Sequence, residues 1–367
     1  MSITSQIQGL IQDRDDIREA LVSKSVSSAT GSGFDDFAED IISIWSGSLY
    51  VDFTQIGYSK ADSIACNSLI YKQLQASVQA YQSCSNLPVD SSYYLAGKEI
   101  YWFPDIDFSG VEDLSNFAQS GSLVYIDRII LPDAKNTKWM FDNNPNLGHI
   151  SEISTSNNLW QAADMFRNCS KLKEVPVFNT SRVVDFSGMF WGCTALESVP
   201  NLEVATSSIQ HPDYVTGSIN MDDMFRYCTG LSGSISSTIF ANMGGVKNAG
   251  AMFMGCSNIT AIQETMDLSS LTLDERPVED SGYWGGMNMF RGCTNLSYLH
   301  LTGLRVNLGQ DGLSDCPLAT ESVEYIVQNL GTPLAGTDTF YVGSSNLAKL
   351  SAQTIADAEA KGWTISA

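Results

Sequence analysis

The segments MFRNCSKLKEV (residues 165–175) and MFWGCTALESV (residues 189–199) are two copies of one pattern that decides the fold. Each begins with Met-Phe and places Cys four residues after the Met, Leu after seven and Val after ten. Met-Phe occurs six times, beginning at positions 140, 165, 189, 224, 252 and 289. The 12 Met and 16 Phe of the 367-residue chain would give about 0.5 such pairs by chance, so the chain contains internal repeats.

The other copies keep the spacing with few departures. The fourth position after the Met is occupied by Cys169, Cys193, Cys228, Cys256 and Cys293. Asn144 replaces Cys in the first copy, and a degenerate seventh copy follows at Leu313 and Cys316. Successive Met-Phe pairs lie 25, 24, 35, 28 and 37 residues apart. The unit therefore has about 24 residues, and the longer copies carry insertions.

A unit of this length cannot bury its apolar side alone, so we expect successive coils to stack and share one core. The aromatic ring of each pair would fill that core from a helical or turn segment, and the Leu and Ile/Val positions would point inward from a short strand that follows. The expected core rings are Phe141, Phe166, Phe190, Phe225, Phe253 and Phe290.

The regularly spaced Cys are expected to be small buried residues with a weak donor. They would form a ladder that bonds main-chain groups in the turn. Disulfides along this column stay open as an alternative in an oxidising setting. Close pairs such as CxxC, which zinc sites use, are absent from the sequence, so we expect no metal site.

The copies MFRNCSKLKEVP, MFWGCTALESVP and MFRGCTNLSYL resemble the BspA-like leucine-rich repeats of bacterial and gut-associated surface proteins. The linking segments LPDAKNTKWMF and FNTSRVVDFSGMF fit this resemblance, as do ATESVEYIVQNL, FYVGSSNLAKL and AKGWTI near the end. It covers roughly residues 122–367. It implies an α/β leucine-rich-repeat solenoid, which displays a surface and by itself says little of function.

We expect four parts along the chain. Residues 1–48 form a helical attachment module, and residues 49–121 form a helical stretch (60–84) and the first, capping part of the solenoid. Residues 122–318 hold the repeats, and residues 319–367 form a capping α/β segment. Terminal repeats are atypical because they cover an exposed edge of the core.

The N-terminal residues 3–22 have helical spacing of apolar residues, with Ile7, Leu10, Ile17 and Leu21 on one side. This is a short heptad pattern, and two interpretations stay open: a helix packed on its own domain, or a helix for self-association. DIREALVSKSV and FDDFAEDIISI resemble a module of gut bacteriophage virion proteins that precedes a fibre or adhesin body. That resemblance implies attachment to other virion proteins, and we expect a homo-oligomer.

The charge balance excludes several partners. With 20 Lys+Arg against 41 Asp+Glu, the net charge is −21. Sequence-independent nucleic-acid binding needs cations that neutralise phosphates, so no nucleic-acid partner is expected. No run of about 18 apolar residues is present, so no membrane insertion is expected either. The first residues lack a basic start followed by an apolar run. We therefore expect synthesis in a host cytoplasm and a final place in a virion.

Motifs of catalysis are missing from the sequence. The three His (His149, His211 and His300) belong to no HExxH motif, and neither GxSxG nor GxxxxGK[ST] occurs. DNNPN at residues 142–146 lacks the Gly and Glu of a calcium loop and indicates a turn. We expect no catalytic residue, cofactor or metal.

The insertions are the candidate binding loops, because insertions in repeat proteins gather on one face. Their candidate residues are His211, Asp213, Tyr214, Asp280, Tyr283 and Trp284. Aromatic rings beside carboxylates can stack on a sugar and bond its hydroxyls. Two alternatives stay open: these rings pack under their own loops, or they contact another virion protein.

The expected function is that of a non-enzymatic virion structural protein, as a fibre or a capsid or tail decoration. It would present the repeats to a host-surface glycan or protein. The first alternative is a BspA-like adhesin on a bacterial cell surface. The second is a glycan-degrading virion enzyme, because paired carboxylates are recognised by their separation in space.

Overall fold

The computed structural model describes residues 95–97, 102–103, 106–204, 219–272 and 286–367. The expected attachment module (residues 1–48) and the helical stretch over residues 60–84 lie outside these residues. So do most of both insertions.

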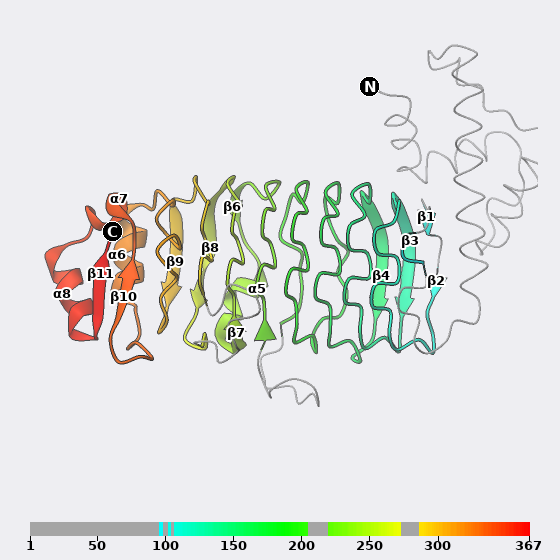
Figure 1. Cartoon of the computed structure of the whole chain (residues 1–367), viewed down its shortest axis with the longest axis horizontal. Coiled ribbons are helices and arrows are strands. Elements are labelled where there is room, and N and C mark those ends of the chain that lie inside the picture. Colours follow the sequence, from blue (N-terminus) through cyan, green and yellow to red (C-terminus); the bar gives the residue numbers. More distant parts are fainter. Residues whose placement is uncertain (1–94, 98–101, 104–105, 205–218, 273–285) are drawn as a thin grey trace, which may run out of the picture.

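The described residues form an elongated body in which successive coils lie side by side in chain order (Figure 1). A row of parallel bridges joins neighbouring coils, through Asp113, Asn136, Gln161, Asp185, Asn220 and Asn248. From residue 136 to 248, the steps of this row are 25, 24, 35 and 28 residues. These equal the first four spacings of the Met-Phe pairs, so one sequence repeat forms one coil.

A main-chain ladder fixes the register of the coils. In five of the six Met-Phe pairs, the N–H of the Phe donates to the carbonyl of the Met in the next coil, at 2.9–3.0 Å. The five donors are Phe141, Phe166, Phe190, Phe225 and Phe253. These bonds join residues far apart in sequence but equivalent in the repeat. The turn segments therefore stack as regularly as strands do, although they are turns and not strands.

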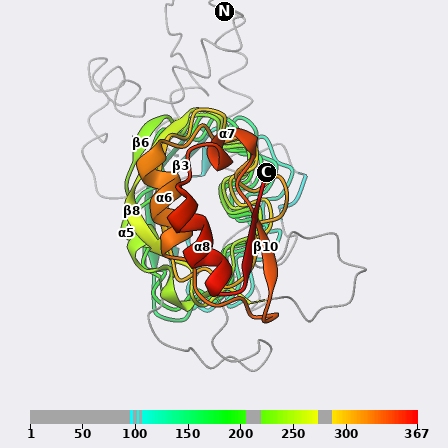
Figure 2. The same ribbon diagram turned by 90° about the vertical axis from the view of Figure 1, so that its left-hand side faces the viewer.

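Short parallel strands line another side of the body, and Figure 2 shows β3, β6 and β8 there together. The first sheet holds β1 (Trp102–Phe103), β2 (Ile106–Asp107), β3 (Tyr125–Leu131) and β4 (His149–Thr155), with β3 paired to the other three. The second holds β6 (Gly233–Ile235), β8 (Ile259–Asp267) and β9 (Tyr298–Thr302) in the order β6-β8-β9. A further pair joins β5 (Ile219–Asn220) to β7 (Val246–Asn248).

A strand follows the Met-Phe turn in several coils, but the copies at residues 165 and 189 have none after them within the described residues 166–184 and 190–204. The expectation of a strand in each coil is wrong for these two. Pro176 and Pro200 lie where that strand would run. Proline has no N–H to donate, so it interrupts strand pairing.

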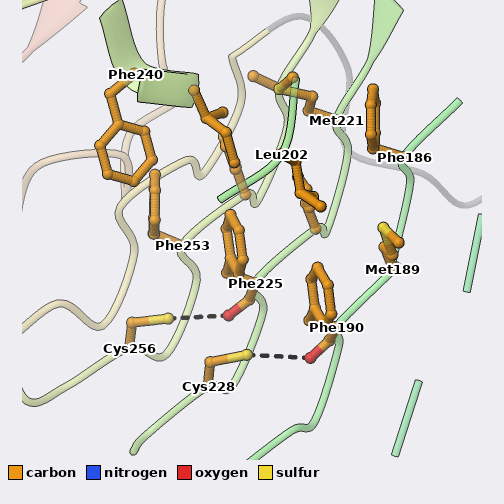
Figure 3. Close-up of a cluster of buried hydrophobic side chains, with 14 of the residues drawn as sticks. Phe186, Met189, Phe190, Leu202, Met221, Phe225, Cys228, Phe240, Phe253 and Cys256 are labelled. Atoms are coloured by element: carbon orange, nitrogen blue, oxygen red, sulfur yellow. Dashed lines mark hydrogen bonds between the residues drawn. The ribbon is translucent and has the colours of Figure 1, made fainter. Parts of the chain in front are cut away.

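The core runs the length of the stack as one continuous apolar cluster. At its centre, the six Phe rings of the Met-Phe pairs lie nearly parallel, with centroids 5.6–5.8 Å apart and interplanar angles of 4–17°. Figure 3 shows part of this column, with Phe240 packed edge-on against Phe253. Phe240 belongs to α5 (Thr238–Ala241), which with the 3₁₀ turn η2 (Met243–Gly245) occupies the extra length of the 28-residue coil.

The C-terminal elements cover one end of the stack (Figure 2). They are α6 (Thr320–Gln328), β10 (Asp338–Tyr341), α7 (Ser344–Leu347), α8 (Ala352–Ala360) and β11 (Trp363–Ser366). The apolar side of α6, with Val323, Ile326 and Val327, is buried. Trp363 of β11 packs edge-on against Phe340 of β10. This segment closes the core at that end.

Candidate binding surface

The repeated Cys form an inter-coil ladder. Each thiol donates to the carbonyl of the Phe in the preceding coil, at 2.9–3.4 Å, and Figure 3 shows two of these bonds. The donors are Cys169, Cys193, Cys228, Cys256, Cys293 and Cys316, which are all buried and unpaired by disulfides. Burial raises the pKa of every one, to about 12 for Cys256. Because the thiolate is the reactive form, these thiols are structural.

Asn takes the place of Cys towards both ends of this column. Asn144 donates to the carbonyls of Ala118 and Phe141 at 2.8 and 2.9 Å, and its Oδ1 accepts from the N–H of Leu123 at 3.1 Å. At the other end, Asn346 donates to the carbonyls of Cys316 and Val342. An amide forms several bonds where a thiol forms one. It therefore suits the ends, where the coils depart from the regular pattern.

Two positions in each turn have a left-handed backbone. The residue before Met has φ between 48° and 58°, and the residue three after Met has φ between 58° and 78°. Asn, Asp and Gly, which tolerate this conformation, hold most of these positions. Trp139 and Tyr227, with φ of 57° and 59°, are bulky exceptions. Strained bulky residues of this kind cluster at functional sites, so the turn edge is the candidate surface.

The candidate surface, here called the turn-edge strip, combines aromatic rings with paired charges. It comprises Lys138, Trp139, Asp142, Asp164, Arg167, Trp191, Asp223, Arg226 and Tyr227. These residues come from four consecutive coils. Three cations balance three carboxylates, so the strip is neutral in sum although the whole chain carries −21.

A chain of contacts runs along the strip across three coil boundaries. Arg167 binds Asp142 with two bonds, at 2.9 and 3.0 Å. The Arg167 and Arg226 guanidinium carbons lie 5.7 and 4.7 Å from the Trp191 ring centroid. Arg226 also binds Asp223 at 3.0 Å and lies 5.1 Å from the Tyr227 ring. Cation–π contacts and bidentate pairs both fix the geometry of their members, so this surface is rigid.

Burial changes the protonation of two carboxyls in the strip. It raises the pKa of Asp164 to about 6, although Arg167, whose Nη1 is 3.5 Å from Asp164 Oδ1, lowers it in part. Burial also raises the pKa of Asp223, against the opposing effect of Arg226. Asp164 therefore changes charge at about pH 6.

Two aromatic clusters lie on the strand side. Tyr125 of β3 stacks on His149 of β4, with centroids 5.0 Å apart. His300 of β9 lies 4.6 Å from Tyr298 and 4.0 Å from Tyr325 of α6. Each cluster is small, and the second joins the last repeat to the C-terminal segment.

The insertion residues that the sequence singles out lie outside the described residues: His211, Asp213, Tyr214, Asp280, Tyr283 and Trp284. The residues of the expected attachment helix lie outside them too: Ile7, Leu10, Ile17 and Leu21. The structure brings together the repeat residues instead, with the Phe and Cys columns in the core. In the described segments, no cluster of three or more His, Cys, Asp or Glu could hold a metal ion. Across the same segments, no helix has the length and apolar character to cross a membrane.

The turn-edge strip was not expected from the sequence. Aligned copies do carry its signal, since the second position after Met reads Asp, Arg, Trp, Arg, Met, Arg. A second unexpected column lies four residues before Met, where every copy from residue 136 to 248 has Asn, Gln or Asp. Its side chains bond their own turn and, in several cases, each other across coils, as Gln161 does with Asp185 at 3.0 Å. These side-chain bonds between neighbouring coils support the coil register.

Comparison with known proteins gives one match. A family model described as "Mycoplasma protein of unknown function, DUF285" matches residues 161–276, which is 116 of the 367 residues. DUF285 is found in BspA-like repeat proteins. No curated protein matches, and no solved structure matches. The matched region covers coils that contribute Arg167, Trp191, Arg226 and Tyr227 to the strip.

Proposed function

We propose that this chain is a non-enzymatic attachment protein of a bacteriophage particle. In this proposal, the stacked coils are a leucine-rich-repeat solenoid that presents its surface to a host cell. The N-terminal module binds other virion proteins and forms homo-oligomers. Several copies on one particle would then bind with avidity, even where each contact is weak.

One observation carries the attachment role. The side chains that repeat in every coil pack inside the stack and are not available to a partner. The Phe rings, the Cys thiols and the inward Leu residues are all buried. The side chains that vary between coils, such as Arg167 and Trp191 at equivalent positions, lie on the turn edge. A scaffold of this kind holds variable residues in fixed places, as a recognition surface requires. The resemblance of residues 1–48 to phage virion modules supports the particle as its location.

Mass spectrometry of purified virions tests the location. We expect peptides of this chain in the particle, at a copy number comparable to that of fibre or decoration proteins. Absence of the chain from particles, together with its recovery from a bacterial surface, would favour the alternative of a BspA-like adhesin. The DUF285 match supports this alternative, because DUF285 is found in BspA-like repeat proteins.

Incubation with host capsular glycans tests the non-enzymatic character. We expect binding without cleavage, and release of new reducing ends would contradict the proposal.

Light scattering of the full chain and of a chain without residues 3–22 tests self-association. We expect a larger mass for the full chain, and equal monomeric masses would contradict it.

A further inference from the structure

The strand side of the stack has a gap in the middle of the body. The first sheet ends at β4 and the second begins at β6, and the two coils between them have no strand on this side in their described residues (Figure 1). We call residues 172–180 and 196–204 the strand-side gap. Pro176 and Pro200 lie in it and have no N–H to donate to a neighbouring coil.

Main-chain bonds between coils are scarce across this gap. Among the described residues of β4, the strand-side gap and β6, one such bond joins neighbouring coils, from the Glu197 N–H to the Lys173 carbonyl at 2.9 Å. The side chains of this pair also form an ion pair, but both are 65% exposed, and exposed ion pairs stabilise little. Threonine hydroxyls add bonds from Thr155 to the Asn179 carbonyl, from Thr180 to the Glu203 carbonyl and from Thr238 to Asn201.

The turn edge is closed at the same three coil boundaries, which lie between the Met140 and Met224 coils. At each boundary, four N–H groups of the turn donate to carbonyls of the next coil, at 2.6–3.1 Å. The turn-edge strip adds one side-chain contact to each boundary: Arg167 with Asp142, Arg167 with Trp191, and Arg226 with Trp191. The middle of the stack is therefore held firmly along one edge and loosely along the other.

We propose that the strand-side gap is a hinge of the body, and that the turn-edge strip is the axis about which the body bends. Opening the gap breaks few bonds, whereas opening the turn edge breaks four main-chain bonds at every boundary. The bend is small, because Val175 and Phe178 beneath the gap belong to the continuous core. Hinges of this kind let rigid parts, here the two sheets, move relative to each other. The hinge goes beyond the proposed attachment role and does not depend on it.

Hydrogen exchange of the full chain, resolved by residue, tests the hinge, because amide exchange measures local opening. The N–H groups of Glu197 and Ser297 lie at equivalent positions, eight residues after their Met, and each donates to a carbonyl of the preceding coil at 2.9 Å. Ser297 directly precedes β9, which is paired to β8, so its coil boundary is closed by a sheet. After correction for intrinsic rates, Glu197 should exchange at least tenfold faster than Ser297. Equal rates would overturn the inference.

Two further N–H groups distinguish bending from other motions. Leu196 donates within its own coil, to the Cys193 carbonyl at 3.1 Å, and bending leaves this bond intact. Phe190 donates across a coil boundary in the turn, at 2.9 Å. Both should exchange at least tenfold more slowly than Glu197. A Leu196 rate equal to that of Glu197 would mean that the segment frays, and an equal Phe190 rate would mean that whole coils separate; either result overturns the inference.

The double variant Pro176→Ser/Pro200→Ile tests the cause of the gap. It restores both N–H groups, with the residue types that β4 and β6 carry eleven positions after their Met. Exchange of Glu197 should slow at least threefold, towards the rate of Ser297. The control Pro145→Ser, which installs the residue type of the next coil at a turn position, should leave this rate unchanged. An unchanged Glu197 rate in a folded double variant would contradict the hinge. If the double variant does not fold, the comparisons within the parent chain still decide.

Discussion

Gly230 shows at the scale of one residue how closely neighbouring coils approach. A Cβ there would lie 2.6–2.8 Å from main-chain atoms of Thr194, Ala195 and Leu196 in the preceding coil. Because main-chain atoms cannot rotate away, we expect Gly230→Ala to lower the free energy of unfolding by about 1–3 kcal/mol. Urea denaturation measures the change.

Gly244→Ala is the matched control for this substitution. Its Cβ would meet only Asp267 Oδ2 at 3.6 Å, and its backbone is not left-handed. We expect a change within about 0.5 kcal/mol. If both variants lost the same free energy of unfolding, the close approach of neighbouring coils would not be the reason for glycine at position 230.

Asp164 makes stability depend on pH. Its carboxyl titrates near 3.8 when unfolded and about 6 when folded, so the native state binds more protons between these values. The free energy of unfolding therefore falls as pH rises through this window and levels off above it. Asp164→Asn cannot titrate, so its stability relative to the parent should increase by about 1 kcal/mol between pH 5 and pH 7.5.

Urea denaturation at pH 5, 6 and 7.5 measures this difference. Glu359→Gln, which changes an exposed carboxyl on α8, should keep the pH dependence of the parent. A constant difference between Asp164→Asn and the parent at all three pH values would show that Asp164 is not the titrating group.

At the scale of the element, the ladder residues differ in how many buried groups they satisfy. Asn144 satisfies two carbonyls and one N–H, whereas Cys193 donates one weak bond to the carbonyl of Phe166 at 3.1 Å. We expect Asn144→Ala to lose about 2–4 kcal/mol, because buried polar groups remain unpaired, and Cys193→Ala to lose about 1 kcal/mol. Chemical denaturation of both variants decides this, and a larger loss for Cys193→Ala would contradict it.

The sequence predicts elements where one periodicity dominates and fails where a local effect competes. The Met-Phe spacing gives the register of the coils from residue 136 to 248, because each copy contributes one layer of the same core. It does not reveal that Pro176 and Pro200 remove two strands, since the apolar pattern continues through them. The sequence does not predict the turn-edge strip, because Trp191 and Tyr227 are single departures from the repeat. Only the stacking of the coils brings them to one surface.

For the whole molecule, the stack predicts that a complete coil can be removed. Deletion of residues 161–184 joins Trp160 to Asp185, the residue that Gln161 pairs with in the next coil. We expect a folded chain that is about 5 Å shorter, the distance between adjacent parallel strands, and less stable. Small-angle X-ray scattering and circular dichroism measure both properties.

Deletion of residues 161–172 is the control, because it removes half a coil, including the Met-Phe turn, and puts the rest of that coil out of register with its neighbours. This variant should not fold. If both deletions fold equally well, or if neither does, the coils are not the independent units that the register indicates.

The parallel register also has a consequence for inheritance. Since equivalent residues make the same contacts from coil to coil, unequal recombination between repeats of the gene would add or remove a layer without creating a mismatched junction. Related genes should therefore encode stacks with different numbers of coils. Selection could then change the length of the stack while the contacts between neighbouring coils stay the same.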